Sequence, residues 1–208
     1  AEKLNIGFCK RMRVGRPYVR SKMAMSVDSR TAMASGESKW ITGTAARQDV
    51  QRLRARSSAM LTGIGTVLAD NPALSVRPEG WYPQQTIRQP LRVVVDSQLR
   101  IPVDAKIFED NAQVLIATSD VVKTIAQAEV CRLPSDNNRV DLAALMTELA
   151  KREINEVMVE AGSQLNGALL QSGLIDELVI YMAPKIMGDG ANALNSNAGV
   201  VLMCHEKV

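Results

Sequence analysis

The chain has 208 residues, of which 46% are hydrophobic and 23% are charged, and its formal net charge is +3. These values are typical of a globular protein, and the length suits one domain with a sizeable core rather than a disordered or fibrous chain. No apolar run approaches the roughly 20 residues that span a bilayer, no signal peptide is recognisable, and aromatic residues make up only 3%, so membrane, secretory and nucleic-acid roles are disfavoured.

The first half of the chain is predicted to contain a strand, a helix and a second strand. Thr42 or Thr44 can cap the helix, because a threonine hydroxyl can accept a hydrogen bond from a free N–H group of the first turn. In chain order we expect a basic segment over 5–16, a strand over 18–26, turns over 28–36, a helix over about 44–57, and a strand at 60–61 that ends in a turn at 63–65.

The second half alternates strands and helices more clearly. Short apolar runs at 92–96, 114–117, 157–159 and 178–181 are typical of buried strands. Apolar residues at 142, 145, 146 and 149 have helical spacing, and 165–170 reads as the centre of another helix. Alternation of this kind predicts an α/β domain with a mostly parallel sheet covered on both faces. A loop over 188–192 and a last strand over 200–203 follow, and the order of elements after about 195 is left open.

Cysteine and histidine are too few and too scattered for metal or nucleophilic chemistry. Cys9, Cys131 and Cys204 form no C-x-x-C pair and are odd in number, which favours a reducing cytoplasm over a disulfide framework. His205 is the single histidine, so a zinc site or a catalytic triad would depend on it alone. We therefore expect no metal, and chemistry that depends on a bound cofactor or on the placement of charges.

A strand-to-helix turn is the first candidate site. Glu160, Ala161, Gly162 and Ser163 follow a predicted strand and open a predicted helix. Small residues there leave backbone N–H groups free to bind a phosphate, and the helix dipole adds partial positive charge. Gly167 would allow this helix to approach a strand or a ligand closely. The G-x-G-x-x-G fingerprint is absent, so an ordinary loop is the alternative.

Three further stretches are candidates. The helix over 44–57 carries arginines at 47, 52, 54 and 56, and Arg54 lies at the border of its buried face. An arginine there is either solvated along its stem or bound to a ligand phosphate as a bidentate fork. The segment 63–72, followed by Leu74 and Arg77, is either a functionless loop or a ligand loop. Trp40 closes a polar turn and is either a core residue or a wall for a cofactor ring.

Together these stretches resemble one protein family. Residues 22–32 (KMAMSVDSRTA), 36–42 (GESKWIT) and 63–72 look like the reductase domain of the bifunctional riboflavin-biosynthesis deaminase/reductase, and 159–162 (VEAG) and 183–185 (APK) fit its later motifs. The resemblance runs from about Asn5 to Asp189. Ser29 departs from it, because the family usually has glycine in an S-L-D-G-R turn.

The resemblance implies a dihydrofolate-reductase-like fold and a reaction. NADPH would transfer a hydride to C1′ of the ribosyl group of 5-amino-6-(5-phosphoribosylamino)uracil and give 5-amino-6-(5-phosphoribitylamino)uracil. In such a reaction the cofactor supplies the difficult chemistry, and the protein supplies orientation, electrostatics and exclusion of water. This division agrees with the scarcity of histidine and metal ligands.

The site residues that the resemblance implies fall into three groups. The catalytic residues would be Glu160 and Lys22, the latter to stabilise charge or relay a proton, with a partly buried structural lysine as the alternative. Arg54 and Arg77 suit the substrate's phosphate, and Glu160 suits hydrogen bonds to the substrate's polar groups. The substrate contacts would be Ser38, Arg54, Leu74, Arg77 and Glu160. The NADPH contacts would be Ala24, Trp40, Thr66, Asp70, Ser97, Gly162, Ser163, Gln164, Leu165, Asn166, Gly167 and Ala168.

The resemblance also implies partners. Residues 1–16 resemble the end of the family's deaminase part and its linker, and 17–208 resemble the reductase domain. The zinc ligands of such a deaminase, H-x-E and P-C-x-x-C, do not occur here. We therefore expect the reductase half of a longer parent chain, acting on a phosphorylated pyrimidine and forming a homodimer.

Other functions remain open. A related reductase could act on the undeaminated pyrimidine or on a pterin, although the paired arginines favour a phosphorylated substrate. A nucleotide-binding module without turnover is a second alternative. A basic nucleic-acid binder is the third and poorest, and it would bind DNA or RNA with a steep dependence on salt.

Overall fold

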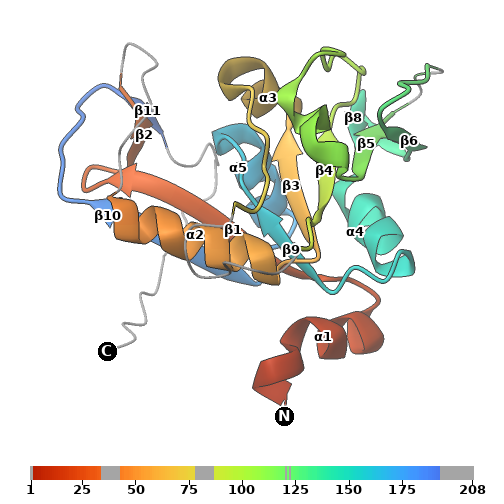
Figure 1. Ribbon diagram of the computed structural model, residues 1–208, viewed down its shortest axis with the longest axis horizontal. Coiled ribbons are helices and arrows are strands. Elements are labelled where there is room, and N and C mark those ends of the chain that lie inside the picture. Colours follow the sequence, from red (N-terminus) through yellow and green to blue (C-terminus); the bar gives the residue numbers. More distant parts are fainter. Residues whose placement is uncertain (1, 34–42, 78–86, 120, 122, 193–208) are drawn as a thin grey trace.

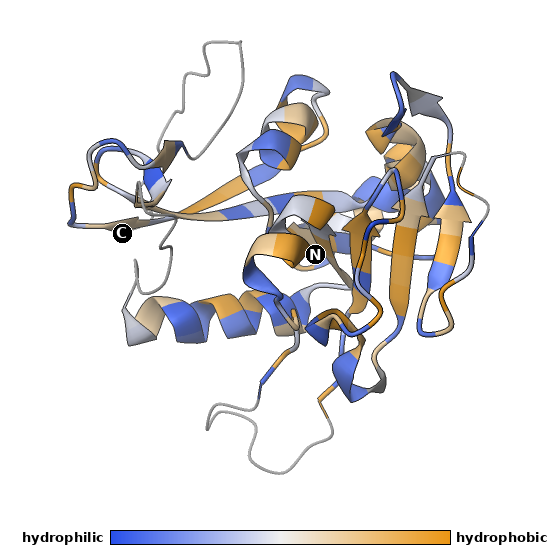
Figure 2. Cartoon of the chain, turned by 90° about the horizontal axis from the view of Figure 1, so that it is seen from above, coloured by the Kyte–Doolittle hydropathy of each residue, from blue (hydrophilic) through white to orange (hydrophobic). Residues whose placement is uncertain are grey.

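The computed structural model describes residues 2–33, 43–77, 87–119, 121 and 123–192. Its centre is a seven-stranded sheet in the order β10-β1-β9-β3-β4-β5-β6, in which every neighbouring pair is parallel (Figure 1). The strands are mostly apolar, as buried parallel strands must be (Figure 2). Their bounds are β1 Tyr18–Ser26, β3 Ala59–Gly63, β4 Leu91–Val95, β5 Val114–Thr118, β6 Glu129–Arg132, β9 Glu156–Val159 and β10 Glu177–Ala183.

Helices cover both faces of this sheet. On one face, α2 (Thr44–Arg56) and α3 (Ile64–Asp70) contribute Val50, Ile64 and Val67 to a core that includes Met60, Val94, Ile116 and Met158. On the other face, α4 (Leu142–Lys151) and α5 (Ser163–Gln171) contribute Leu145, Leu149 and Leu169 to a second core. The α/β class and the mostly parallel sheet flanked by helices are therefore confirmed.

The remaining elements are short. A 3-10 turn, η1 (Glu2–Asn5), leads into α1 (Ile6–Val14), and η2 (Lys106–Asn111) precedes β5. Two antiparallel pairs lie outside the main sheet: β2 (Arg30–Ala32) with β11 (Ala191–Asn192), and β7 (Ser135–Asp136) with β8 (Arg139–Val140). Within the described ranges, no helix has both the length and the apolar character needed to cross a membrane.

Several predicted elements need correction. The turn expected after the strand at 60–61 is the start of α3, because Gly63 acts as an N-cap in extended conformation and the chain enters a helix directly. Gly43 rather than Thr44 caps α2, and the Thr44 hydroxyl accepts a hydrogen bond from Arg47 at 3.0 Å instead. The loop over 188–192 ends in β11, while Thr42 and the strand over 200–203 lie outside the described residues.

The turn after β1 contains Ser29, the position at which this chain differs from the glycine usual in the family. This residue has φ 61°, in the left-handed region that glycine adopts without strain. The Asp28 carboxylate accepts hydrogen bonds from Ser26 and from the backbone N–H groups of Met187 and Gly188, at 2.5 to 3.1 Å. The Ser26 hydrogen bond is the largest cause that lowers the pKa of Asp28, to about 2. The strained turn is thus held against the segment that follows β10.

Candidate functional site

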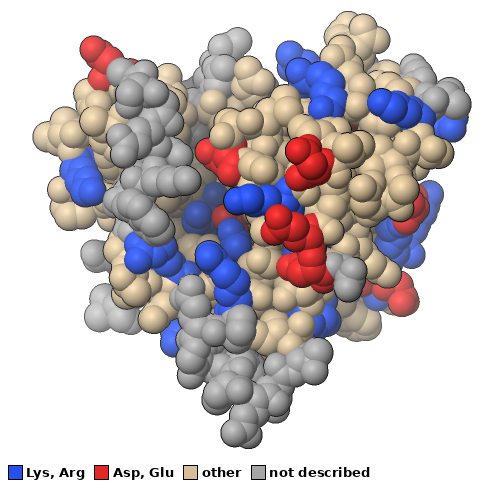
Figure 3. Space-filling model, turned by 45° about the horizontal axis from the view of Figure 1, so that its top comes forward, with Lys and Arg blue, Asp and Glu red and all other residues tan. Residues whose placement is uncertain are grey.

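The carboxyl ends of β9 and β3, and the part of β1 that extends past its pairing with β9, bring the candidate residues together at one side of the sheet. These strands are parallel neighbours, with β9 in the middle, so residues that follow them lie side by side. Lys22 comes from β1, Glu160 follows β9, and Thr66 lies in the helix after β3. Figure 3 looks toward this side of the molecule and shows basic and acidic side chains gathered around a recess.

Glu160 is the centre of a charged cluster, here called the Glu160 cluster, that also contains Arg54 and Lys22. Arg54 donates from Nε to Oε1 of Glu160 at 2.6 Å and from Nη2 to Oε2 at 3.0 Å, which is a bidentate pair. Lys22 Nζ lies 3.6 Å from Oε2. The three side chains are only 13 to 18% exposed, so water screens their charges weakly.

The Glu160 cluster keeps its carboxylate ionised. Burial raises the pKa of Glu160, but the charges and hydrogen bonds of Arg54 and Lys22 outweigh it and lower this pKa to about 2. The pKa of Arg54 is raised, because its attraction to Glu160 outweighs its own burial. At neutral pH the site therefore presents a fixed negative charge between two cations.

The loop that follows α3 closes over the Glu160 cluster. Arg54 Nη1 donates to the carbonyl of Ser75 at 3.0 Å, and the backbone N–H of Arg77 donates to Oε1 of buried Gln51 at 2.9 Å. Leu74, the residue before Ser75, has its side chain in the core and φ at 52°, a conformation that is uncommon for leucine. The loop therefore sets the exposed side chain of Arg77 close to the cluster's helix.

Arg54 has less capacity for a substrate phosphate than the sequence suggested. A guanidinium carries five N–H donors, and Glu160 and Ser75 already accept from three different nitrogens. One N–H on each terminal nitrogen is left over. The structure thus joins two residues expected to contact the substrate into one pair, and Arg54 can hold Glu160 in place in addition to any ligand contact.

A second part of the site is the start of α5 beside α3, here called the α5 cradle. Gly162 is the N-cap of α5 without a side-chain cap, and its N–H donates to Thr66 Oγ1 at 3.2 Å. A Cβ added at Gly162 would have Thr66 Oγ1, 3.8 Å away, as its nearest contact, so the space in front of the helix is open. Free N–H groups and a helix dipole facing open space fit the phosphates of a dinucleotide cofactor.

Three other residues predicted to contact the cofactor, Ala24, Asp70 and Ser97, lie outside the α5 cradle. Ala24 lies two residues after Lys22 and thus on the same face of β1, and Asp70 is one helical turn beyond Thr66 on α3. Ser97 ties neighbouring elements together. Its Oγ accepts from Val140 N–H at 3.1 Å, and its carbonyl accepts from the hydroxyls of Thr118, the last residue of β5, and Ser119.

The predicted stretch 162–168 divides into two parts. Gly162 and Gln164 are exposed and Ser163 is half-buried, so these three face the cradle. Gly167 and Asn166 are buried, and Asn166 accepts from Ser21 Oγ at 2.8 Å and donates to the Ala161 carbonyl at 2.7 Å. Leu165 and Ala168 are half-buried, and Leu165 packs on the core. Ser38 and Trp40 lie outside the described residues.

The sequence analysis missed one polar pair near the Glu160 cluster. Tyr181 of β10 donates its hydroxyl to Asp49 of α2 at 2.6 Å, and it is the register partner of Ala24. Burial is the largest cause that raises the pKa of Tyr181, with contributions from Asp49 and the charge of Glu160. No local pattern links residues 49 and 181, so only the fold shows this contact.

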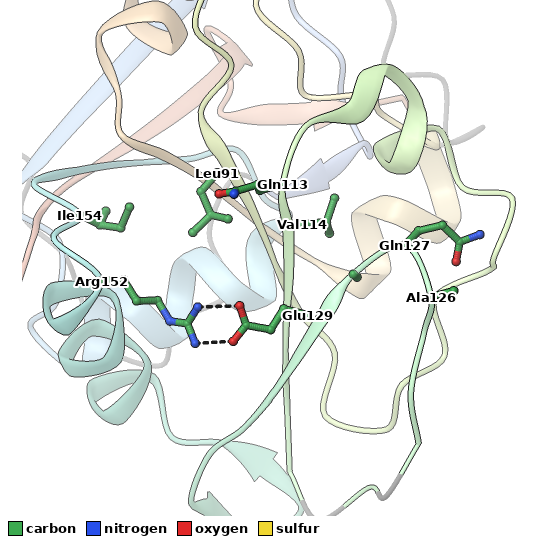
Figure 4. A pocket seen from close by; sticks show the side chains of 9 residues that line it. Leu91, Gln113, Val114, Ala126, Gln127, Glu129, Arg152 and Ile154 are labelled. Carbon is green, nitrogen blue, oxygen red and sulfur yellow. Dashed lines mark hydrogen bonds and ion pairs between the residues drawn. The ribbon is translucent and has the colours of Figure 1, made fainter.

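A cavity of about 450 Å³ lies away from this site. It is lined by residues at the amino ends of β4, β5 and β6, among them Leu91, Val114 and Glu129, and by Arg152 after α4 (Figure 4). Arg152 and Glu129 pair there in bidentate fashion at 2.6 and 2.8 Å, so their charges already satisfy each other. We assign the chemistry to the opposite edge, where the ionised cluster and the open cradle meet. Among the described residues, no group of three His, Cys, Asp or Glu could hold a metal ion.

The fold and the site define an α/β domain in which an open helix start, with a geometry that fits a phosphate, lies beside a buried ionised cluster. The family model described as the RibD C-terminal domain matches residues 17–206. The chain belongs to this family, and the dihydrofolate-reductase-like fold expected from the resemblance is confirmed.

Three comparisons illustrate the relationship. The riboflavin biosynthesis protein RibD of Escherichia coli strain K12 is 47% identical over 96% of this chain and 57% of its own length. A Buchnera aphidicola (subsp. Acyrthosiphon pisum) protein named 5-amino-6-(5-phosphoribosylamino)uracil reductase is 39% identical over 78% of this chain and 83% of its own length. The solved structure of a diaminohydroxyphosphoribosylaminopyrimidine deaminase/5-amino-6-(5-phosphoribosylamino)uracil reductase from Thermotoga maritima is 30% identical, with a TM-score of 0.82 over 97% of this chain and 55% of that one. The chain thus spans little more than half of its longer relatives.

Proposed function

We propose that the chain reduces 5-amino-6-(5-phosphoribosylamino)uracil to its ribitylamino product with NADPH. The observation that carries this proposal is that the ionised Glu160 and the open N-terminus of α5 at Gly162 are only two residues apart, in the turn that follows β9. A cofactor phosphate held at the cradle and a polar substrate held at the cluster would thus be neighbours. The printed name of the Buchnera relative supports the same reaction.

The residues of the Glu160 cluster have distinct roles in this proposal. NADPH supplies the hydride when it is bound. Glu160 accepts hydrogen bonds from the hydroxyl groups of the opened ribosyl chain, and Arg54 fixes the direction of its carboxylate. In the open-chain form of the substrate, C1′ is the carbon of an imine. Lys22, beside Glu160, gives a proton to the nitrogen of this imine as C1′ receives the hydride, and the product is a neutral secondary amine.

Arg77 is the residue we assign to the substrate phosphate. Its side chain is exposed, while its backbone is fixed to Gln51. A charged hydrogen bond from arginine to phosphate contributes about 1.5 to 3 kcal/mol. Arg77→Ala therefore raises the KM for the phosphorylated substrate by about tenfold or more and leaves the KM for NADPH unchanged.

The proposal also covers the parent chain and its assembly. We infer that a deaminase portion belongs to the parent chain, that residues 1–16 link it to the reductase domain over 17–208, and that the protein is a cytoplasmic homodimer. What supports the deaminase portion is that the chain covers only 55% of the Thermotoga deaminase/reductase.

The experiment is an assay of NADPH oxidation with two substrates. The deaminated phosphoribosylamino-pyrimidine is compared with its amino precursor, and NADPH binding is measured separately by fluorescence. We expect turnover with the first substrate and little with the second. Turnover with the precursor alone would assign the chain to the undeaminated pyrimidine, and NADPH binding without turnover on either would refute the proposed reaction.

A further inference from the structure

Helix α1 contacts the body of the domain through glycine and polar side chains and leaves large apolar side chains exposed. It crosses the amino-terminal edge of the sheet, below the strands in Figure 1. Its polar side faces the body: Lys10 pairs with Asp176, and Arg11 Nε donates to Asn155 Oδ1 at 2.7 Å. A surface helix normally turns its apolar stripe inward and its charges to solvent.

An exposed flank of this segment, beside Arg11, carries large apolar residues at a spacing of four, and the Arg11 guanidinium lies 5.8 Å from the centre of the Phe8 ring. Leu4 of η1 and Phe8 and Met12 of α1 are 84%, 48% and 64% exposed. We call these three residues the α1 stripe. Scattered exposed apolar residues are ordinary, but three at a constant spacing along one continuous helical segment are typical of an interaction surface.

The orientation of α1 is fixed by its contact with the body. Gly7 is buried, and a Cβ there would lie 2.7 Å from the carbonyl oxygen of Asn155, so only glycine allows this approach. The Asp176 carboxylate that pairs with Lys10 also accepts from Val19 N–H at 2.8 Å. The helix therefore cannot roll its stripe inward without losing these contacts.

We propose that the α1 stripe is the surface on which the preceding deaminase portion of the parent chain packs. This inference rests on the proposed deaminase portion and does not depend on the reductase activity. Residues 1–16 lie before the family's C-terminal domain, which begins at 17, yet the similarity to the longer Thermotoga structure includes 97% of this chain. The helix is thus placed between the two parts.

The area of the stripe favours a tethered occupant over a free one. Three such side chains bury only a few hundred Å², which is less than the roughly 800 Å² per partner of a stable interface between separate molecules. A portion of the same chain joined to residue 1 has an effective concentration in the millimolar range. At that concentration a small apolar contact is enough to keep the two parts packed together. A second copy of the chain has no such advantage.

Hydroxyl-radical footprinting of the chain alone and of the full-length product of its gene tests this proposal. Because side chains at the centre of an interface lose contact with water, we expect the modification of Phe8 and Met12 to fall by about fivefold or more in the longer protein. Val103 and Ile186, which are 66% and 83% exposed elsewhere, serve as internal controls and keep their rates.

Matched variants complete the test. In the longer protein, Phe8→Gln with Met12→Gln should return the modification of Leu4 to its rate in the chain alone, while Val103→Gln should not. These side chains are exposed in the chain alone, so the variants keep its fold. Unchanged rates at Phe8 and Met12, a gene product without a deaminase portion, or protection that grows with the concentration of the chain alone would each overturn the proposal.

Discussion

Replacing Glu160 with glutamine should remove a pH-dependent part of the free energy of unfolding. Burial raises the pKa of Glu160, but Arg54 and Lys22 lower it to about 2, from an ordinary value of 4.5. One pKa unit corresponds to about 1.4 kcal/mol, so the ionised carboxylate contributes about 3 kcal/mol near neutral pH. The side chain is 14% exposed, so solvent screening reduces this figure little.

The direction of the pH dependence follows from the lower pKa in the folded state. The contribution is present above the unfolded pKa and is lost as the pH falls toward the folded one. About 2 kcal/mol of it is gone by pH 3. Glutamine cannot ionise and leaves Arg54 without its carboxylate, so Glu160→Gln is less stable than the wild type by about 3 kcal/mol or more at pH 7.

Urea unfolding at several pH values measures this difference. The stability gap between wild type and Glu160→Gln should narrow by about 2 kcal/mol between pH 6 and pH 3. The exposed Glu153 provides a matched control, because Glu153→Gln removes a carboxylate outside the cluster. A gap for Glu160→Gln that stays constant over this range would refute the reasoning about the cluster.

Three other substitutions test separate parts of the structure. Ser29→Gly should raise the free energy of unfolding by about 0.5 to 1 kcal/mol, because φ at this position is 61°; thermal or urea unfolding would contradict this if stability fell. Gly162→Val should weaken NADPH binding by about tenfold or more with an unchanged far-UV spectrum, and normal binding would disprove the α5 cradle. Ser21→Ala leaves buried Asn166 one hydrogen bond short and should cost about 1 to 3 kcal/mol in unfolding experiments; a loss of NADPH affinity without loss of stability would instead make Asn166 a cofactor ligand.

The sheet could be predicted wherever a strand has a strong local pattern. The strand at 18–26 has the predicted bounds, and the runs at 92–96, 114–117, 157–159 and 178–181 are strands within a few residues. β6 and the two antiparallel pairs were missed because they have at most four residues per strand and are held by pairing rather than by their own composition.

The candidate site could be predicted only in part. The residue types at 160–163 left a phosphate-binding turn and an ordinary loop as alternatives, and the structure places a helix start without a side-chain cap there. The pairing of Arg54 with Glu160 could not be foreseen, because 106 residues separate them and each was considered alone as a ligand contact. The hydrogen bond between Tyr181 and Asp49 could not be predicted for the same reason, because 132 residues separate them in the sequence.

The position of β9 explains why these separate signals meet. β9 lies between β1 and β3, and its last paired residue, Val159, faces Ser21 on one side and Leu61 on the other. The next residue, Glu160, therefore meets Lys22 from β1, and Gly162 two residues later meets Thr66 from the helix after β3. A strand at the edge of the sheet would have a neighbour on one side only. The central position of β9 thus allows one turn to serve both the Glu160 cluster and the α5 cradle.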